Sequence, residues 1–302
     1  MISGRVVTAS IIALFVVPAT AQQTSDDLFV PSISSPAYES GKGPVVIIDE
    51  AHGNFHTASG RFKPFADVLM ADGYRVKSYT TQFSAERLDS SRILVIANAL
   101  HEVNQSNWSL PTPSAFTNEE IAEVGKWVER GGSLFLIADH MPFPGAAAQL
   151  AALFGVKFYN GFAMGKQQGK DIFTAKNGLQ QTVLTRGGKP EEAISSLQSF
   201  TGQAFEIPVE ATPVIVLNEE FEMLIPQTAW QFDTNTQKLP ATNLVQGAYL
   251  NFGNGRVVVF GEAAMFTAQV AGNGKVGLNA PDAKQNMQFL LNTIHWLDHI
   301  LN

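Results

Sequence analysis

Cysteine is absent from all 302 residues of the sequence. This absence excludes disulfides, thiolate metal sites and thiol nucleophiles. Basic residues are also scarce, since 20 Lys and Arg face 27 Asp and Glu, for a net charge of −7. An acidic chain is a poor partner for nucleic acid or for an anionic membrane surface, because both attract basic patches. We therefore expect neither nucleic acid nor a membrane as a partner, and look instead for a small-molecule ligand or substrate.

Long apolar stretches are missing as well, apart from one near the N-terminus. A single basic residue, Arg5, precedes a nearly continuous apolar run at residues 6–17. Pro18 ends the run, and Ala19 and Ala21 supply the small residues that signal peptidase recognises. The run is shorter than the ~20 residues that a membrane span needs. The pattern predicts a signal peptide at residues 1–21 and an exported protein, periplasmic or secreted.

Several short apolar runs rich in β-branched residues indicate strands that are buried on both faces of a sheet. Segments with apolar residues at helical spacing separate them, and Thr117 with Glu120 forms a capping box at the start of one helix. This alternation predicts an α/β fold with a doubly wound, mostly parallel sheet. The expected strands are residues 44–49, 74–79, 92–98, 133–138, 213–217, 247–252 and 256–261, and the expected helices are residues 61–72, 117–130 and 146–154, with a last helix capped by Asn279 or Asp282.

The remaining segments complete the predicted organisation. Residues 22–43 are rich in Ser, Pro, Gly and Asp and are expected to be a flexible lead-in. Residues 44–302 are expected to form a single domain. Within it, residues 157–212 are short, polar, turn-rich pieces that predict a β-rich excursion on the sheet edge.

Ligands of a doubly wound sheet bind outside the carboxyl ends of its strands. Four of the predicted strands are followed there by Asp, His, Asn or Glu, and this convergence predicts a site. The candidate catalytic residues are His52, Asp139, His140 and Glu262, the candidate metal ligands are His52, His56, His140 and Glu262, and Asp49 and Asn98 are candidate supporting residues. His295 and His299 lie four residues apart on the last helix, and we interpret them as part of a solvated face.

Several familiar catalytic motifs are absent. The sequence contains no phosphate-binding Gly-rich loop with Lys and no Gly-x-Ser-x-Gly elbow. His52 and His56 have the spacing of a zinc-protease pair, but Gly53 stands where the general-base Glu belongs. These absences leave the reaction undefined.

The layout resembles the class I glutamine amidotransferase-like superfamily, and more narrowly a branch of exported domains of unknown function. This resemblance implies a flavodoxin-like sheet. Members that hydrolyse glutamine use a cysteine after a central strand, and the comparable turn here is Asp139-His140, so thioester chemistry is excluded. The segments that carry the resemblance are residues 48–57, 136–145, 200–205, 261–269 and 285–296.

Two functions are consistent with these residues. The first is a hydrolase acting on a small polar or sugar-like substrate, either with a divalent metal such as zinc or through general acid–base catalysis. The second is a non-catalytic ligand-binding domain that kept the fold and lost the nucleophile.

Overall fold

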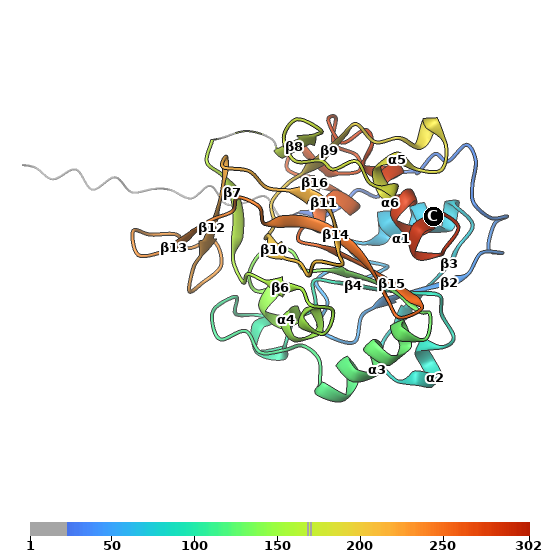
Figure 1. The fold of residues 1–302 in the computed structure, drawn as a ribbon, viewed down its shortest axis with the longest axis horizontal. Helices are drawn as coiled ribbons and strands as arrows, with labels where there is room; N and C mark the ends of the chain where they lie inside the picture. The colour runs from blue at the N-terminus through green and yellow to red at the C-terminus, as the bar shows by residue number, and fades with distance from the viewer. Residues whose placement is uncertain (1–22, 168, 170) are drawn as a thin grey trace, which may run out of the picture.

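A computed structural model describes residues 23–167, 169 and 171–302, and a nine-stranded mixed sheet forms its centre (Figure 1). Five strands run parallel in the order β3-β2-β4-β5-β15. Beyond β15 the pairing becomes antiparallel, through β14 to β10 and β6, and β11 also pairs with β14. The α/β fold class is confirmed. The strands are β2 (Val45–Asp49), β3 (Arg75–Tyr79), β4 (Ile93–Ala97), β5 (Ser133–Ile137), β6 (Lys157–Phe158), β10 (Phe205–Glu206), β11 (Thr212–Val216), β14 (Val245–Phe252) and β15 (Gly255–Phe260).

Helices cover both faces of the parallel strands. All five residues of β2, β4 and β5 are buried, and successive side chains point to opposite faces. Val46 and Ile48 join the core that contains α1 and α6, whereas Val45 and Ile47 join the core that contains α3 and α4. In Figure 1, α2, α3 and α4 lie along the lower side of the sheet. The helices are α1 (Lys63–Ala71), α2 (Ala85–Leu88), α3 (Asn118–Glu129), α4 (Phe143–Leu153), α5 (Val183–Arg186) and α6 (Asn286–Leu297), with short 3₁₀ turns η1 (Glu102–Asn104), η2 (Pro190–Glu192) and η3 (Ala264–Phe266).

Helix α3 begins where the sequence predicted, whereas helix α6 does not. Thr117 and Glu120 form the expected capping box at the N-terminus of α3. The final helix begins later than predicted, with Gln285 as its N-cap and no side-chain cap. The side chain of Asn279 instead donates hydrogen bonds to Asp26 Oδ2 at 2.8 Å and to the Gln269 carbonyl at 3.1 Å. Long-range hydrogen bonding therefore replaced the local cap that the sequence suggested.

Smaller sheets flank the central one. Within residues 157–212, β8 and β9 pair with each other, and β7 forms a three-stranded sheet with the later strands β12 and β13. The β12–β13 hairpin projects from the body at the left of Figure 1. β16 and β17 form another small sheet close to η3. These strands are β7 (Phe162–Gly165), β8 (Asp171–Thr174), β9 (Ser196–Ser199), β12 (Phe221–Ile225), β13 (Gln237–Pro240), β16 (Ala268–Ala271) and β17 (Gly274–Gly277).

The lead-in packs along the domain in this structure. Its first strand, β1 (Thr24–Ser25), pairs antiparallel with β16. Further along, the Ala37 N–H donates to Asp72 Oδ1 at 2.7 Å, and the Tyr38 hydroxyl donates to Asp298 Oδ2 at 2.5 Å. The proposed signal peptide, residues 1–21, lies outside the described residues. Among the residues that are described, no helix is both long enough and apolar enough to span a bilayer.

The two histidines near the C-terminus are not a solvated face, which corrects the expectation from sequence. His295 Nε2 lies 2.6 Å from Asp72 Oδ2, so its ring links α6 to the end of α1. His299 follows α6 in a left-handed conformation with φ of 68°, and burial lowers its pKa. The i,i+4 spacing gave no indication of Asp72, because that partner is 223 residues away.

Candidate functional site

Two polar clusters lie beyond the carboxyl ends of the parallel strands. We call the first the His52 cluster, made of Asp49, His52, Asn54 and Glu120. We call the second the Asn98 cluster, made of His56, Asn98, Asp139, His140 and Glu262. All the candidate residues from the sequence fall into one of these two groups.

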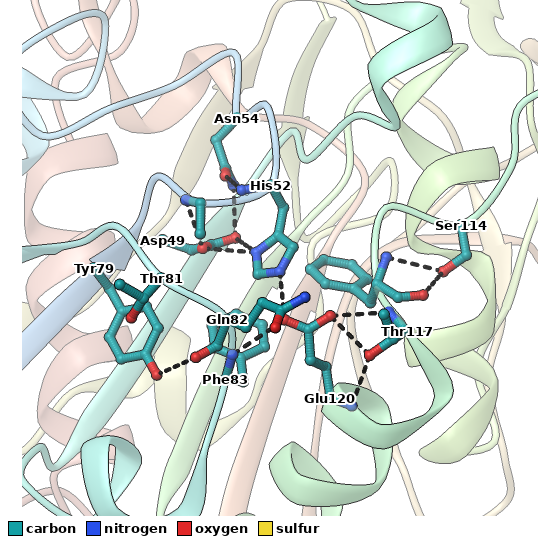
Figure 2. A network of polar contacts seen from close by, with 12 residues as sticks. Asp49, His52, Asn54, Tyr79, Thr81, Gln82, Phe83, Ser114, Thr117 and Glu120 are labelled. Carbon is teal, nitrogen blue, oxygen red and sulfur yellow. Dashed lines mark hydrogen bonds and ion pairs between the residues drawn. The ribbon is translucent and has the colours of Figure 1, made fainter.

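His52 lies between two carboxylates (Figure 2). Its Nδ1 is 2.9 Å from both oxygens of Asp49, and its Nε2 is 2.9 Å from Glu120 Oε1. Burial disfavours the charged ring, but the hydrogen bonds and negative charges of Asp49 and then Glu120 outweigh it and raise the pKa of His52. Both ring nitrogens of His52 face carboxylate oxygens, so neither one has a lone pair directed at a metal.

The carboxylates of the His52 cluster, Asp49 and Glu120, also accept hydrogen bonds from other groups. Asn54 Nδ2 donates to Asp49 Oδ2 at 3.0 Å, and the Phe83 N–H donates to Glu120 Oε1 at 3.1 Å. Burial raises the pKa of Glu120, but hydrogen bonds from Thr117 and His52 outweigh burial and lower it. The His52 cluster thus ties the loop after β2 to the first turn of α3. Sequence reasoning identified Glu120 as a helix cap and missed its second role as the partner of His52.

Asn98 organises the second cluster. It ends β4 in a left-handed conformation with φ of 54°. Its Oδ1 accepts the Asp139 N–H at 2.9 Å, so its Nδ2 is the group that faces His56 Nδ1 at 3.1 Å. His56 Nδ1 must then be an acceptor, which places the ring proton on Nε2. Burial, followed by the charges of Arg61 and His140, lowers the pKa of His56 to about 3, so this ring is neutral.

Asp139 and Glu262 form a buried pair of carboxyl groups at the ends of β5 and β15. Asp139 Oδ1 accepts the His140 N–H at 2.7 Å, and the two oxygens of Glu262 accept the N–H groups of Ala264 and Met265, each at 2.7 Å. Glu262 is 0% exposed. Burial raises the pKa of both groups, and the neighbouring charge of Asp139 raises that of Glu262 further. The pair therefore retains a proton more tightly than two surface carboxyls do.

The His140 side chain lies against an aromatic wall. Its ring stacks on Phe162 with centroids 4.7 Å apart, and Trp230 meets it edge-on at 4.7 Å. His140 Nδ1 is 2.8 Å from the carbonyl oxygen of Met141, which can only accept, so Nδ1 is a donor. The His140 backbone N–H donates to Asp139 Oδ1, so this residue lies next to the Asp139–Glu262 pair.

The structure brings five of the predicted residues together in the Asn98 cluster and engages His52 elsewhere. The hydrogen bonds and ion pairs of His52 go to Asp49, Asn54 and Glu120. Over residues 23–167, 169 and 171–302, no group of three or more His, Asp or Glu side chains is arranged to hold a metal ion. The expected metal stays a prediction, which elemental analysis of the purified protein would test.

A pocket of about 430 Å³ opens between the loops that follow β2 and β4. We call it the Arg61 pocket. None of the predicted catalytic or metal-binding residues lines it. Sequence reasoning missed Arg61, because a single basic residue before a helix carries no recognisable pattern. The lining residues are Glu50, Gly53, Asn54, Phe55, Thr57, Gly60, Arg61, Leu100 and Gln105.

Comparisons with known proteins show similarity of fold. No protein-family model matches the sequence, and no curated protein matches it either. The mmIFT52 N-terminal domain is similar in structure, with a TM-score of 0.61 and 14% identity over 84% of this chain and 97% of that one.

Two bacterial or archaeal structures are more distant. A ThuA-like protein from Bacteroides uniformis has a TM-score of 0.46 and 10% identity, covering 89% of this chain and 94% of that one. A protein described as a GMP synthase subunit, from Thermoplasma acidophilum, has a TM-score of 0.43 and 13% identity, covering 84% and 97%. At such identities a likeness concerns the fold and not the activity.

Proposed function

We propose that this chain is a small-molecule binding domain built on a doubly wound, flavodoxin-like sheet, with its ligand in the Arg61 pocket. Numbered along the chain, its five parallel strands have the spatial order 2-1-3-4-5, which is the flavodoxin-like order. The strand order reverses between β2 and β4. Ligands of such sheets bind in the crevice at this reversal, outside the carboxyl ends of the strands.

The observation that carries this proposal is the position and chemistry of the Arg61 pocket. Its walls come from the loops after β2 and β4, the two strands that flank the reversal. Arg61, Glu50 and Gln105 bring a cation, an anion and an amide to one cavity. Its volume falls within the ~300–1,000 Å³ typical of small-molecule sites. The His52 cluster, by contrast, uses its polar atoms internally and supports the pocket loop.

Membership of the class I glutamine amidotransferase-like superfamily is part of the same proposal. The sheet order and the turn at Asp139-His140 support it. Since the chain has no cysteine, its activity is not that of a thiol amidotransferase. Loss of the nucleophile with retention of the strand-end pocket is what a binding domain derived from such an enzyme would show.

A second candidate, hydrolysis of a small polar or sugar-like molecule, is favoured by the Asn98 cluster. The Asp139–Glu262 pair, whose pKa values are raised, could donate a proton to a leaving group, and His140 Nε2 could hydrogen-bond the attacking water. A divalent metal such as zinc would instead need three ligand atoms within about 2.0–2.2 Å of a common point. Loss of turnover in Glu262→Gln or His140→Ala, with pocket binding intact, would establish this function in place of the first.

The experiment that tests the binding function is a thermal-shift screen of small polar metabolites against the wild-type chain and Gln105→Trp. The exposed side chain of Gln105 lines the pocket, so a tryptophan there should fill it without disturbing the core. We expect ligands that stabilise the wild type to have no effect on Gln105→Trp. Equal stabilisation of both proteins would place the ligand elsewhere and contradict the proposal.

Export belongs to the proposal as well. Arg5, the apolar run and the small residues before Gln22 support it. N-terminal sequencing of protein recovered from the periplasm or the medium should begin at Gln22. An intact Met1 on the protein would contradict it.

A further inference from the structure

We infer that the Arg61 pocket recognises an oxyanion, so that its ligand is a small molecule carrying one carboxylate, phosphate or sulfate group. This inference rests on the proposed function, because it names the chemistry of the ligand in the same pocket. The observation that carries it is the guanidinium of Arg61, which lines the pocket and has a buried Nε without a hydrogen-bond partner among the described residues.

Arg61 is a cation without a partner in the described chain. It forms no ion pair and no hydrogen bond through its side chain with any residue that the structure describes, and its Nε is buried. Its guanidinium carbon lies 4.0 Å from the centroid of the Phe55 ring, which holds the planar group against one wall of the pocket. Burial lowers the pKa of Arg61, yet arginine keeps its charge in proteins. A buried donor in such a position calls for an acceptor from outside the chain.

The start of α1 adds a second favourable contribution for an anion. Arg61 lies two residues before Lys63, the first residue of this nine-residue helix. Phe62 occupies the N-cap and provides no side-chain acceptor, and the first turn contains no acidic residue. The positive end of the helix dipole is therefore not neutralised by a side chain of the helix itself. The dipole and the guanidinium favour the same sign of charge in a ligand.

Glu50 limits the ligand to one anionic group. Its Oε1 already accepts hydrogen bonds from the Ala58 N–H and the Ser78 hydroxyl, both at 2.8 Å. No ion pair within 4.0 Å joins Glu50 to Arg61, so the two charges face the pocket without neutralising each other. A second oxyanion beside Glu50 would be repelled, whereas a hydroxyl or amine would be bound. The ligand class is therefore a molecule with a single oxyanion group and with hydrogen-bond donors at its other end.

Backbone geometry near Gly53 keeps Gln105 in the pocket wall. Gly53 has φ of 57°, and a Cβ atom at this position would lie 2.5 Å from Gln105 Nε2. Any larger residue would push the amide away. The amide can donate to a ligand oxygen and accept from a hydroxyl, which suits a polar body attached to the oxyanion.

Calorimetric titration with inorganic phosphate, sulfate and acetate, each at the same ionic strength as a chloride reference, tests the inference. We expect at least one of these anions to bind the wild-type chain, and Arg61→Gln to weaken that binding by about tenfold or more, since charge-assisted bonds are lost. Arg61→Lys should fall between the two, because it keeps the charge without the planar fork. Binding of phosphate alone or acetate alone identifies which oxyanion the site prefers.

Arg130→Gln is the matched control. It removes the same charge from an exposed arginine that is ion-paired with Asp89, away from the pocket. We expect it to bind as the wild type does. Equal weakening in Arg130→Gln and Arg61→Gln would reveal a general effect of net charge and overturn the inference. Circular dichroism and melting of the ligand-free variants establish that each one is folded.

An experiment can distinguish an error in the oxyanion inference from an error in the proposed binding function. Ligands retained from a small-molecule extract can be identified by mass spectrometry for the wild type, Arg61→Gln and Gln105→Trp. Neutral ligands that are lost only in Gln105→Trp would keep the binding function and overturn the oxyanion. An absence of ligand and of any anion response in the wild type would overturn both.

Discussion

A histidine between two carboxylates behaves differently from a histidine poised for catalysis. His52 donates one N–H to Asp49 and the other to Glu120, and Phe83 and Phe116 pack against its ring. Such a ring is held from two sides, and it stabilises the loop that forms one wall of the Arg61 pocket. His56, which is neutral, and His140 have ring hydrogen bonds to Asn98 and to the Met141 carbonyl instead of to carboxylates.

The first prediction concerns the charge on Glu120. Glu120→Gln removes one of the two negative charges beside His52 and should lower the free energy of unfolding by about 1–3 kcal/mol. Because the folded pKa of His52 is raised, its contribution is complete below the unfolded value of about 6.5 and declines as pH rises through the folded pKa. Urea denaturation across this pH range should therefore show the variant and wild-type stabilities converging at high pH.

Glu123→Gln serves as the control for this prediction. Its carboxylate pairs with Lys126 on the exposed side of the same helix. Exposed pairs contribute about 0–1 kcal/mol, so we expect little loss and no pH dependence. A loss in Glu120→Gln that is no larger than in Glu123→Gln would contradict the role assigned to the His52 cluster.

The second prediction concerns the Asp139–Glu262 pair. Both folded pKa values are raised, so the folded chain keeps a proton that the unfolded chain releases near pH 4. Stability should therefore fall as pH rises from the unfolded values to the folded ones. Asp139→Asn removes the charge that raises the pKa of Glu262 and should flatten this decline. Parallel stability curves for the variant and the wild type, measured in denaturant from about pH 4 to 8, would show that Asp139 contributes nothing to this decline and would contradict the prediction.

At the scale of elements, the lead-in is part of the packed domain. Tyr38 contacts Tyr74 edge-on at 5.3 Å, and its hydroxyl reaches Asp298 just beyond α6. Burial, with the hydrogen bond and charge of Asp298, raises the pKa of Tyr38 to about 12. The segment before the sheet thereby becomes a link between its first and last helices.

The third prediction follows from this link. Tyr38→Phe removes a hydrogen bond to a carboxylate and should lower the free energy of unfolding by about 1.5–3 kcal/mol. Hydrogen exchange should accelerate in residues 36–43 before it changes in the central strands. Tyr159→Phe is the control, because its hydroxyl bonds Glu206 at an exposed site. Unchanged exchange in the lead-in would mean that Tyr38 does not hold it.

Elements with a local signal were predictable from the sequence. β2, β4, β5 and β15 appear as apolar runs because both of their faces are buried, and the capping box of α3 is contained in four residues. The gathering of Asn98, Asp139 and Glu262 followed from a rule about strand ends. Glu120 beside His52, Asp72 beside His295 and Arg61 in its pocket were not predictable. Each of these features depends on a single polar side chain and on residues that are distant in the sequence, so no periodic pattern indicates its position.

At the scale of the whole molecule, two large buried cores enclose the central sheet, and the pocket that we propose as the binding site opens between the loops after β2 and β4. The polar residues at that edge of the sheet and the pocket beside them have different roles. The His52 cluster and Asn98 hold the two loops in place, and the pocket between the loops is left open to a ligand. This division explains why the most conspicuous histidine is a structural residue in the proposed binding domain.

The pairing of β1 with β16 and the hydrogen bond between Tyr38 and Asp298 also determine the order in which contacts can form while the chain is being synthesised. A ribosome releases the N-terminus first, so the earliest described segment waits for partners that are made about 240 to 260 residues later. The fifth parallel strand, β15, likewise arrives after the other four. A nascent chain of this protein therefore lacks its closing contacts until residues 269–298 have been made. In the export that we propose, the same late contacts would form only after the chain has crossed the membrane.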